Sequence, residues 1–174
     1  MKKIKKFALL AVLVLFYQNS INAEMPYYLD FKYILNESAA GSKAQDSLKN
    51  KLQSGLKTIN AKEKSIQEEE KKIISQKKII TPEEYRKQVT ALRSKVAALR
   101  KEREILLDSV AKSRNKARAE LLKTLNPIIK NHMKDKNIRM VINKNSMLLA
   151  DENLDITDDI IKILNNKLKT IKLN

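Results

Sequence analysis

The chain has 174 residues and a formal net charge of +16, with 36 lysine and arginine residues against 20 acidic ones. It contains no cysteine, no tryptophan, two glycines and three prolines, which excludes a disulfide-stapled scaffold and a turn-rich β architecture. The composition therefore predicts a helix-rich, strongly basic protein with little β-structure.

Residues 1–23 have the pattern of a secretory signal peptide. Four lysines between positions 2 and 6 precede an unbroken apolar stretch from Phe7 to Tyr17. That stretch is shorter than the roughly 20 residues that a membrane-spanning helix needs, so a short uncleaved anchor is the less favoured alternative. We expect cleavage after Ala23 and export of the mature chain.

The mature chain begins with a short strand and a short helix. Met25 to Asp30 reads as a strand after a proline, with Asp30 ending it. Phe31 to Leu35 fits one or two helical turns with Phe31 and Ile34 on one side. A run of small residues from Asn36 to Ser42 then predicts a break in the chain.

Two rows of apolar residues predict a long helical hairpin. The first row repeats every seven residues and comprises Leu52, Ile59, Ile66, Ile73 and Ile80. The second row alternates steps of four and three residues and comprises Tyr85, Val89, Leu92, Val96 and Leu99, with Leu106 and Val110 in phase. Between the rows, Thr81, Pro82 and Glu84 form a capping box with proline at the first helical position. A new helix should therefore begin at Pro82 and fold back on the first.

The first helix is expected from about Lys43 to about Ile79 and the second from Pro82 to about Leu125, with Pro127 tightening or kinking its end. The first helix has a second seam position, four residues after each member of the row, and this position is polar at Glu63, Glu70 and Lys77. This arm should therefore be thin and flexible toward its tip, and Gly55 is a candidate bending point, since a mid-helix glycine costs about 1 kcal/mol relative to alanine.

The net charge is concentrated on this hairpin. Residues 43–126 carry 22 basic and 11 acidic residues, which is +11, whereas the whole mature chain carries +12. A solvated helical face explains many charges but not an excess of one sign. Such a field attracts anionic partners.

The spacing of apolar residues after the second long helix no longer follows the helical repeat. Ile138 to Ile142 reads as a strand, Asn143 to Ser146 as a turn, and Met147 to Ala150 as another strand. A final helix should start within Asp155 to Asp159, capped by Thr157 or Asp155 and favoured by the acids in its first turn.

The predicted fold is mainly α with a small β element (α+β). The domain plan is a signal peptide at 1–23, a body made of 24–42 and 127–174, and a helical hairpin arm at 43–126 with its tip near 79–83. A body this small without disulfides is marginal alone, so we expect it to oligomerise. The predicted body and oligomerisation residues are Tyr27, Leu29, Phe31, Ile34, Leu35, Ile138, Met140, Ile142, Leu148, Ile160 and Leu164.

The arm offers two kinds of candidate contacts to a partner. One is apolar residues outside the seam, for which packing against the opposite helix is the alternative: Ile74, Ile79 and Leu107. The other is cations: Lys71, Lys72, Lys77, Lys78, Arg86, Lys87, Lys112, Arg114, Lys116 and Arg118.

The pattern does not favour an enzyme. His132 is the sole histidine and reads as structural, no glycine-rich phosphate loop occurs, and Asp158 and Asp159 read as helix-start charges. No catalytic residue, metal or cofactor is predicted. A nucleic-acid-binding protein fits the high charge but lacks an aromatic stacking platform on the arm, where Tyr85 is the lone aromatic. A basic coiled-coil adaptor is a second alternative.

Motifs at both ends resemble the Skp/OmpH family of periplasmic chaperones. They are Tyr28 to Ser38, Gly41-Ser42-Lys43, Met140-Val141-Ile142 and Leu154 to Ile161. The resemblance implies a homotrimer in the periplasm whose arms hold unfolded outer-membrane proteins without ATP and prevent their aggregation. The family also suggests lipopolysaccharide as a partner, and the basic arm suits anionic lipid headgroups. Export of the chain argues against a physiological nucleic-acid partner. It transfers no specific client-binding residue, because the arm carries no family motif.

Overall fold

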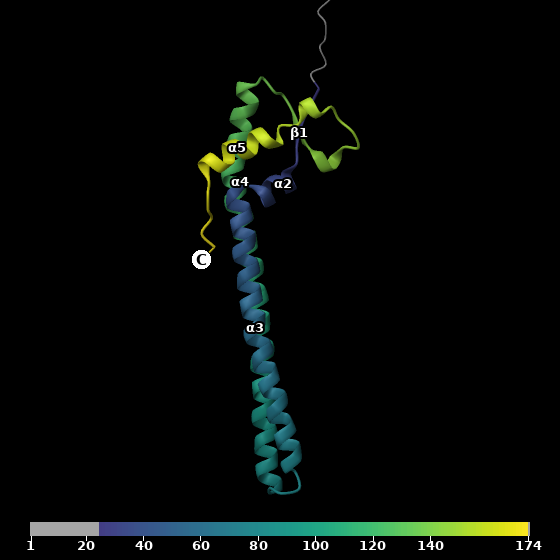
Figure 1. Cartoon of the computed structure of the whole chain (residues 1–174), viewed down its shortest axis with the longest axis vertical. Helices are drawn as coiled ribbons and strands as arrows, with labels where there is room; N and C mark the ends of the chain where they lie inside the picture. The colour runs from purple at the N-terminus through teal and green to yellow at the C-terminus, as the bar shows by residue number, and fades with distance from the viewer. Residues whose placement is uncertain (1–24, 174) are drawn as a thin grey trace, which may run out of the picture.

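A computed structural model describes residues 25–173, and the predicted signal peptide lies outside these residues. The elements in chain order are β1 (Tyr27–Leu29), α2 (Phe31–Glu37), α3 (Ala39–Gln76), α4 (Pro82–Asp135), β2 (Val141–Asn143), two 3₁₀ turns (Lys144–Ser146 and Glu152–Leu154) and α5 (Thr157–Lys167). Figure 1 shows a small body at one end and a long two-helix arm projecting from it. The predicted fold class, mainly helical with a small β element, is confirmed.

The two strands form a parallel pair that joins the beginning and the end of the body. Tyr27 lies opposite Val141 and Leu29 opposite Asn143, so the whole arm is inserted between the paired strands. The other side of β1 is also occupied, because Tyr28 bridges Asp155. The Tyr28 carbonyl oxygen there accepts a hydrogen bond from the Ile156 N–H at 2.9 Å.

The predicted break at residues 36–42 is wrong in extent. α3 begins at Ala39, not at Lys43, because Ser38 alone interrupts the helices and its hydroxyl accepts a hydrogen bond from the Gly41 N–H at 3.3 Å. A Cβ atom at Gly41 would overlap the carbonyl oxygen of Leu35. A glycine at this position therefore lets α2 and α3 meet in a tight corner.

The hairpin forms with its turn where the sequence predicts it. The Thr81 hydroxyl accepts a hydrogen bond from the Glu84 N–H at 3.2 Å and Pro82 opens α4, which confirms the capping prediction. No residue of the seven-residue row is exposed, and Ile59 and Ile73 are buried. A Cβ atom on Gly55 would lie 2.5 Å from the Leu106 side chain, so this glycine leaves room for that leucine in the seam.

The prediction that the second helix ends near Leu125 is wrong, because α4 continues through Pro127 to Asp135. Leu121, Leu125 and Ile128 form one buried stripe across the proline. Burial of that stripe offsets the roughly 3 kcal/mol that an interior proline costs. The predicted boundary between arm and body at 126/127 thus falls inside a continuous helix.

A Schellman motif ends α4. Asn137 has a φ of 56°, the left-handed conformation that follows many helices. The Ile138 N–H donates to the Met133 carbonyl at 2.8 Å and the Asn137 N–H to the Lys134 carbonyl at 3.3 Å. The turn delivers Ile138 into the core, from where the chain runs to β2.

The predicted strand at Met147 to Ala150 does not form. The side chain of Asn143 accepts a hydrogen bond from the Asn145 N–H at 3.3 Å, which starts a 3₁₀ turn instead. Leu148 and Leu149 are then fully exposed. The segment therefore runs as irregular chain between the two 3₁₀ turns.

The hydrophobic core lies where β1, α2, the end of α4 and α5 meet. Its buried members are Leu29, Ile34, Ala40, Leu121, Leu125, Ile128, Ile138, Ile156, Ile160 and Leu164. His132 is buried in the last turns of α4, which fits its structural interpretation. The arm beyond this core is much thinner (Figure 1).

Candidate functional site

The half of the arm nearest the tip has little buried surface of its own. No residue of α4 between Pro82 and Lys112 is buried, and α3 buries only Ile59 and Ile73 beyond Leu48. The two helices are linked across exposed surfaces by ion pairs: Lys62–Glu102 at 2.6 Å, Lys95–Glu69 at 2.7 Å and Arg103–Glu63 at 3.1 Å. Exposed ion pairs contribute little to stability, so this half is held together weakly.

A groove opens along the seam near the tip. It has a volume of about 550 Å³ and is lined by Ile66, Ile73 and Ile74 from α3 and by Tyr85, Val89 and Leu92 from α4, with Glu70 and Arg93 beside them. Glu70 occupies the second seam position here, where an apolar side chain would fill the space. Sequence reasoning placed the seam residues but missed the groove, because the heptad pattern alone suggests a closed seam.

The three predicted apolar contact residues are exposed. Ile74 is 59% exposed, Ile79 82% and Leu107 50%. Ile105, at 57%, is a fourth exposed residue of this kind that the sequence reasoning missed. Its position outside the seam rows was the signal that could have identified it.

The predicted cations are all exposed, but they fall into two groups. The tip group surrounds the turn at residues 77–81: Lys71, Lys72, Lys77, Lys78, Arg86 and Lys87. Within it, the Lys77 ammonium lies 5.9 Å from the centre of the Tyr85 ring, a cation–π distance.

The base group lies about eight turns away along α4: Lys112, Arg114, Lys116 and Arg118. Lys112 is paired with Asp108 at 2.7 Å, and this hydrogen bond and charge raise the pKa of Lys112. Arg114 and Arg118 instead line a separate pocket beside α2. The structure therefore does not bring the two groups together.

The predicted body residues divide by burial. Leu29, Ile34, Ile138, Ile160 and Leu164 are buried in the core of the chain itself. Tyr27, Phe31, Leu35 and Ile142 are partly buried, whereas Met140 and Leu148 are exposed. Only exposed or partly buried members of this set have surface with which to contact another chain.

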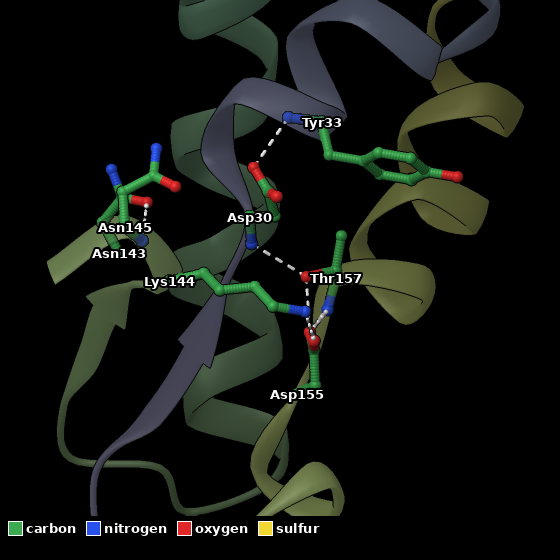
Figure 2. A network of polar contacts seen from close by, with 7 residues as sticks. All are labelled: Asp30, Tyr33, Asn143, Lys144, Asn145, Asp155 and Thr157. Atoms are coloured by element: carbon green, nitrogen blue, oxygen red, sulfur yellow. Dashed lines mark hydrogen bonds and ion pairs between the residues drawn. The ribbon is translucent and has the colours of Figure 1, made fainter. Parts of the chain in front are cut away.

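A polar network joins the three chain segments of the body (Figure 2). The Thr157 hydroxyl accepts a hydrogen bond from the Asp30 N–H at 2.8 Å and donates to the carboxylate of Asp155. Asp155 also accepts from the Thr157 N–H at 2.9 Å and pairs with Lys144 at 3.1 Å. Lys144 in turn lies 5.6 Å from the Tyr28 ring centre.

Of the two residues predicted to cap α5, Asp155 does so, and Thr157 is the first residue of the helix. The residue preceding the helix is Ile156, which makes no side-chain cap, and Asp155 binds the first helical N–H instead. Burial alone raises the pKa of Asp155, but the hydrogen bonds from Thr157 and Lys144 together hold that pKa below its ordinary value. Asp158 and Asp159 lie in the first turn, as predicted.

Within residues 25–173, no group of three or more histidine, cysteine, aspartate or glutamate side chains is arranged to hold a metal ion. In the same part of the chain, no helix is both long and apolar enough to cross a membrane.

Comparison with known proteins matches a family and a fold. Residues 27–164 match the model of the family described as "Outer membrane protein (OmpH-like)". No curated protein matches the sequence. A solved structure from Caulobacter crescentus, provisionally described as an outer membrane chaperone (OmpH-like), is 19% identical, with a TM-score of 0.78 over 90% of this chain and 94% of that chain.

Proposed function

Because this chain belongs to the OmpH-like outer membrane protein family, we propose that it is a periplasmic, ATP-independent holdase. Its clients are unfolded outer-membrane β-barrel proteins, whose aggregation it prevents on their way to the outer membrane. The observation that carries this proposal is the tip half of the arm, where an apolar groove is surrounded by exposed cations.

The physical basis is the chemistry of such clients. Unfolded β-barrel strands expose apolar side chains and unpaired backbone edges, which pair with one another in water. The groove and the exposed Ile74 and Ile79 offer apolar contacts, while the neighbouring lysines attract anionic segments. A protein that binds the unfolded state lowers its free concentration and so slows association.

Weak contacts suit the task because release must proceed without ATP. Several arms acting on one client raise the effective concentration of each contact, so no single tight site is needed. We propose accordingly that the protein is a homotrimer assembled through the body. The exposed Met140, Leu148 and Leu149 beside the short sheet support this assembly.

The first test is suppression of aggregation. An outer-membrane β-barrel protein diluted from urea should scatter less light when the purified mature chain is present, and this protection should weaken as salt rises. Unchanged scattering at a molar excess of the chain contradicts the proposal.

Variants locate the client surface on the arm. Ile74→Ser combined with Ile79→Ser should raise the concentration needed for half-maximal protection at least threefold, because both side chains are exposed near the groove. Tyr33→Ser is the matched control, since Tyr33 is 49% exposed but lies on α2 in the body. Equal losses in both variants would place the client elsewhere.

Sedimentation equilibrium of the mature chain tests the assembly. The expected mass is three times that of the protomer. A stable folded monomer at micromolar concentration would exclude the trimer, and the aggregation assay would then report on the arm of a single chain.

A further inference from the structure

A second pocket lies at the base of the arm and is lined by residues of α2, α3 and α4. Its volume is about 290 Å³. The tight corner at Gly41 forms one wall, because it brings the end of α2 against the start of α3. This pocket is separate from the groove near the tip and shares none of its residues.

The floor of the pocket is apolar. Ala44 and Leu48 of α3 and Ala117 and Leu121 of α4 line it, and all four are buried. Leu35 at the end of α2 adds a partly buried side chain. A ligand group seated here would contact methyl groups rather than solvent.

Two guanidinium groups lie at the rim. Arg114 and Arg118 are four residues apart on α4 and therefore project from the same side of the helix. Neither forms an ion pair with a carboxylate within residues 25–173, and no acidic residue lines the pocket. Elsewhere on the arm, Lys62, Lys95 and Arg103 are each paired with a glutamate.

Amide groups complete the rim. The Gln45 amide nitrogen donates to the Asn36 side-chain oxygen at 2.9 Å across the α2–α3 corner. This bond holds both side chains in place and leaves further amide N–H groups as donors. Asn115 adds a third amide beside the arginines.

We propose that this pocket binds a carboxylate carried on a short apolar group. Arginine forks bind carboxylates through paired, charge-assisted hydrogen bonds, and the buried floor takes the apolar part. The volume is at the small end of ligand pockets, which favours a short chain. Such a carboxylate is either the end of a polypeptide or a free aliphatic acid. The site is independent of the client surface near the tip.

The test uses octanoate as the probe. Titration of the full mature chain, followed by carbon-13 methyl NMR, should shift the methyl signals of Leu48, Ala117 and Leu121. Octanamide has the same apolar tail without the charge and should bind at least tenfold more weakly. Equal binding of octanamide, or shifts confined to the tip, would overturn the proposal.

Two variants and one control make the test specific. Arg114→Gln with Arg118→Gln, and separately Asn115→Asp, should each weaken octanoate binding about tenfold, because the first removes the cations and the second adds a repelling charge. All three side chains are exposed, so the fold should persist. Lys101→Gln with Lys123→Gln removes the same charge from exposed positions of α4 that line neither this pocket nor the groove near the tip, and should leave octanoate binding unchanged. An equal loss in this control would mean that net charge alone governs binding.

A comparison with peptides distinguishes the two sources of the carboxylate. A short acetylated peptide ending in leucine with a free carboxyl terminus is compared with its amidated form and with octanoate. Tighter binding of the free peptide than of octanoate identifies polypeptide ends as the ligand, and the reverse identifies an aliphatic acid. Binding of the amidated peptide as tight as the free acid would contradict a carboxylate site.

Discussion

The two ends of the same helical pair differ sharply in how they are stabilised. At the body end, Leu121, Leu125 and Ile128 of α4 pack into a core with α2 and α5. At the tip end, α4 from Pro82 to Lys112 has no buried residue and meets α3 through a partly buried apolar seam and exposed ion pairs. Burial of apolar area dominates stability. The base of the arm is therefore the more stable end, and the tip is the end whose side chains are exposed to a partner.

Truncation of one core leucine should give the largest difference between the ends. Leu125→Ala removes a side chain with no exposure and should lower the free energy of unfolding by about 3 kcal/mol. Leu92→Ala in the partly exposed seam should cost about 1 kcal/mol. Urea denaturation at one fixed protein concentration measures both values, because an oligomer's stability depends on concentration. Equal costs would show that the tip is as well packed as the core.

Loss of the Thr157 hydroxyl should have the next largest effect. Thr157→Val leaves the Asp30 N–H without its acceptor in the body and should cost about 1–3 kcal/mol. Thr90→Val on the arm is the matched control, since the Thr90 hydroxyl is exposed and donates to the Arg86 carbonyl at 2.9 Å. The control should change stability by less than about 0.5 kcal/mol. A comparable loss in the control would remove the distinction between the two ends.

Acid should weaken the body through Asp155. Its pKa is lower in the folded chain than in the unfolded one, so its contribution is fully present above about pH 4 and is lost as pH falls through the folded value. Asp155→Asn should flatten the dependence of stability on pH below about pH 4. We expect an effect smaller than that of Thr157→Val, because the Asp155 side chain is 23% exposed. Identical pH profiles of the variant and the native chain would exclude this role.

The smallest effect is expected for an ion pair on the arm. Lys62 and Glu102 are about half exposed, so their coupling should be about 0.2–1 kcal/mol. A double-mutant cycle of Lys62→Met and Glu102→Gln isolates this coupling from the single-site effects. A coupling of several kcal/mol would indicate that ion pairs, rather than seam packing, hold the arm together.

Local patterns determined most of the architecture. The seven-residue row from Leu52 to Ile80, together with the cap at Thr81 and Pro82, predicts the hairpin and its turn, because helical periodicity and caps depend on neighbouring residues only. The short strand and helix after Met25 follow from the same kind of local signal. The positions of Ile74 and Ile79 outside the seam left their exposure open, and the structure shows both side chains exposed.

Contacts between distant segments decided the rest. Pro127 predicts a helix end, yet the core contacts of Leu125 and Ile128 carry α4 past it. Met147 to Ala150 has the composition of a strand, but within residues 25–173 no other strand pairs with it.

The groove near the tip and the pocket at Arg114 and Arg118 also required the tertiary structure, because each is a space between helices. The sequence by itself thus determined the elements and the arm. Packing between segments far apart in the chain decided which residues are buried and which cations lie beside a cavity.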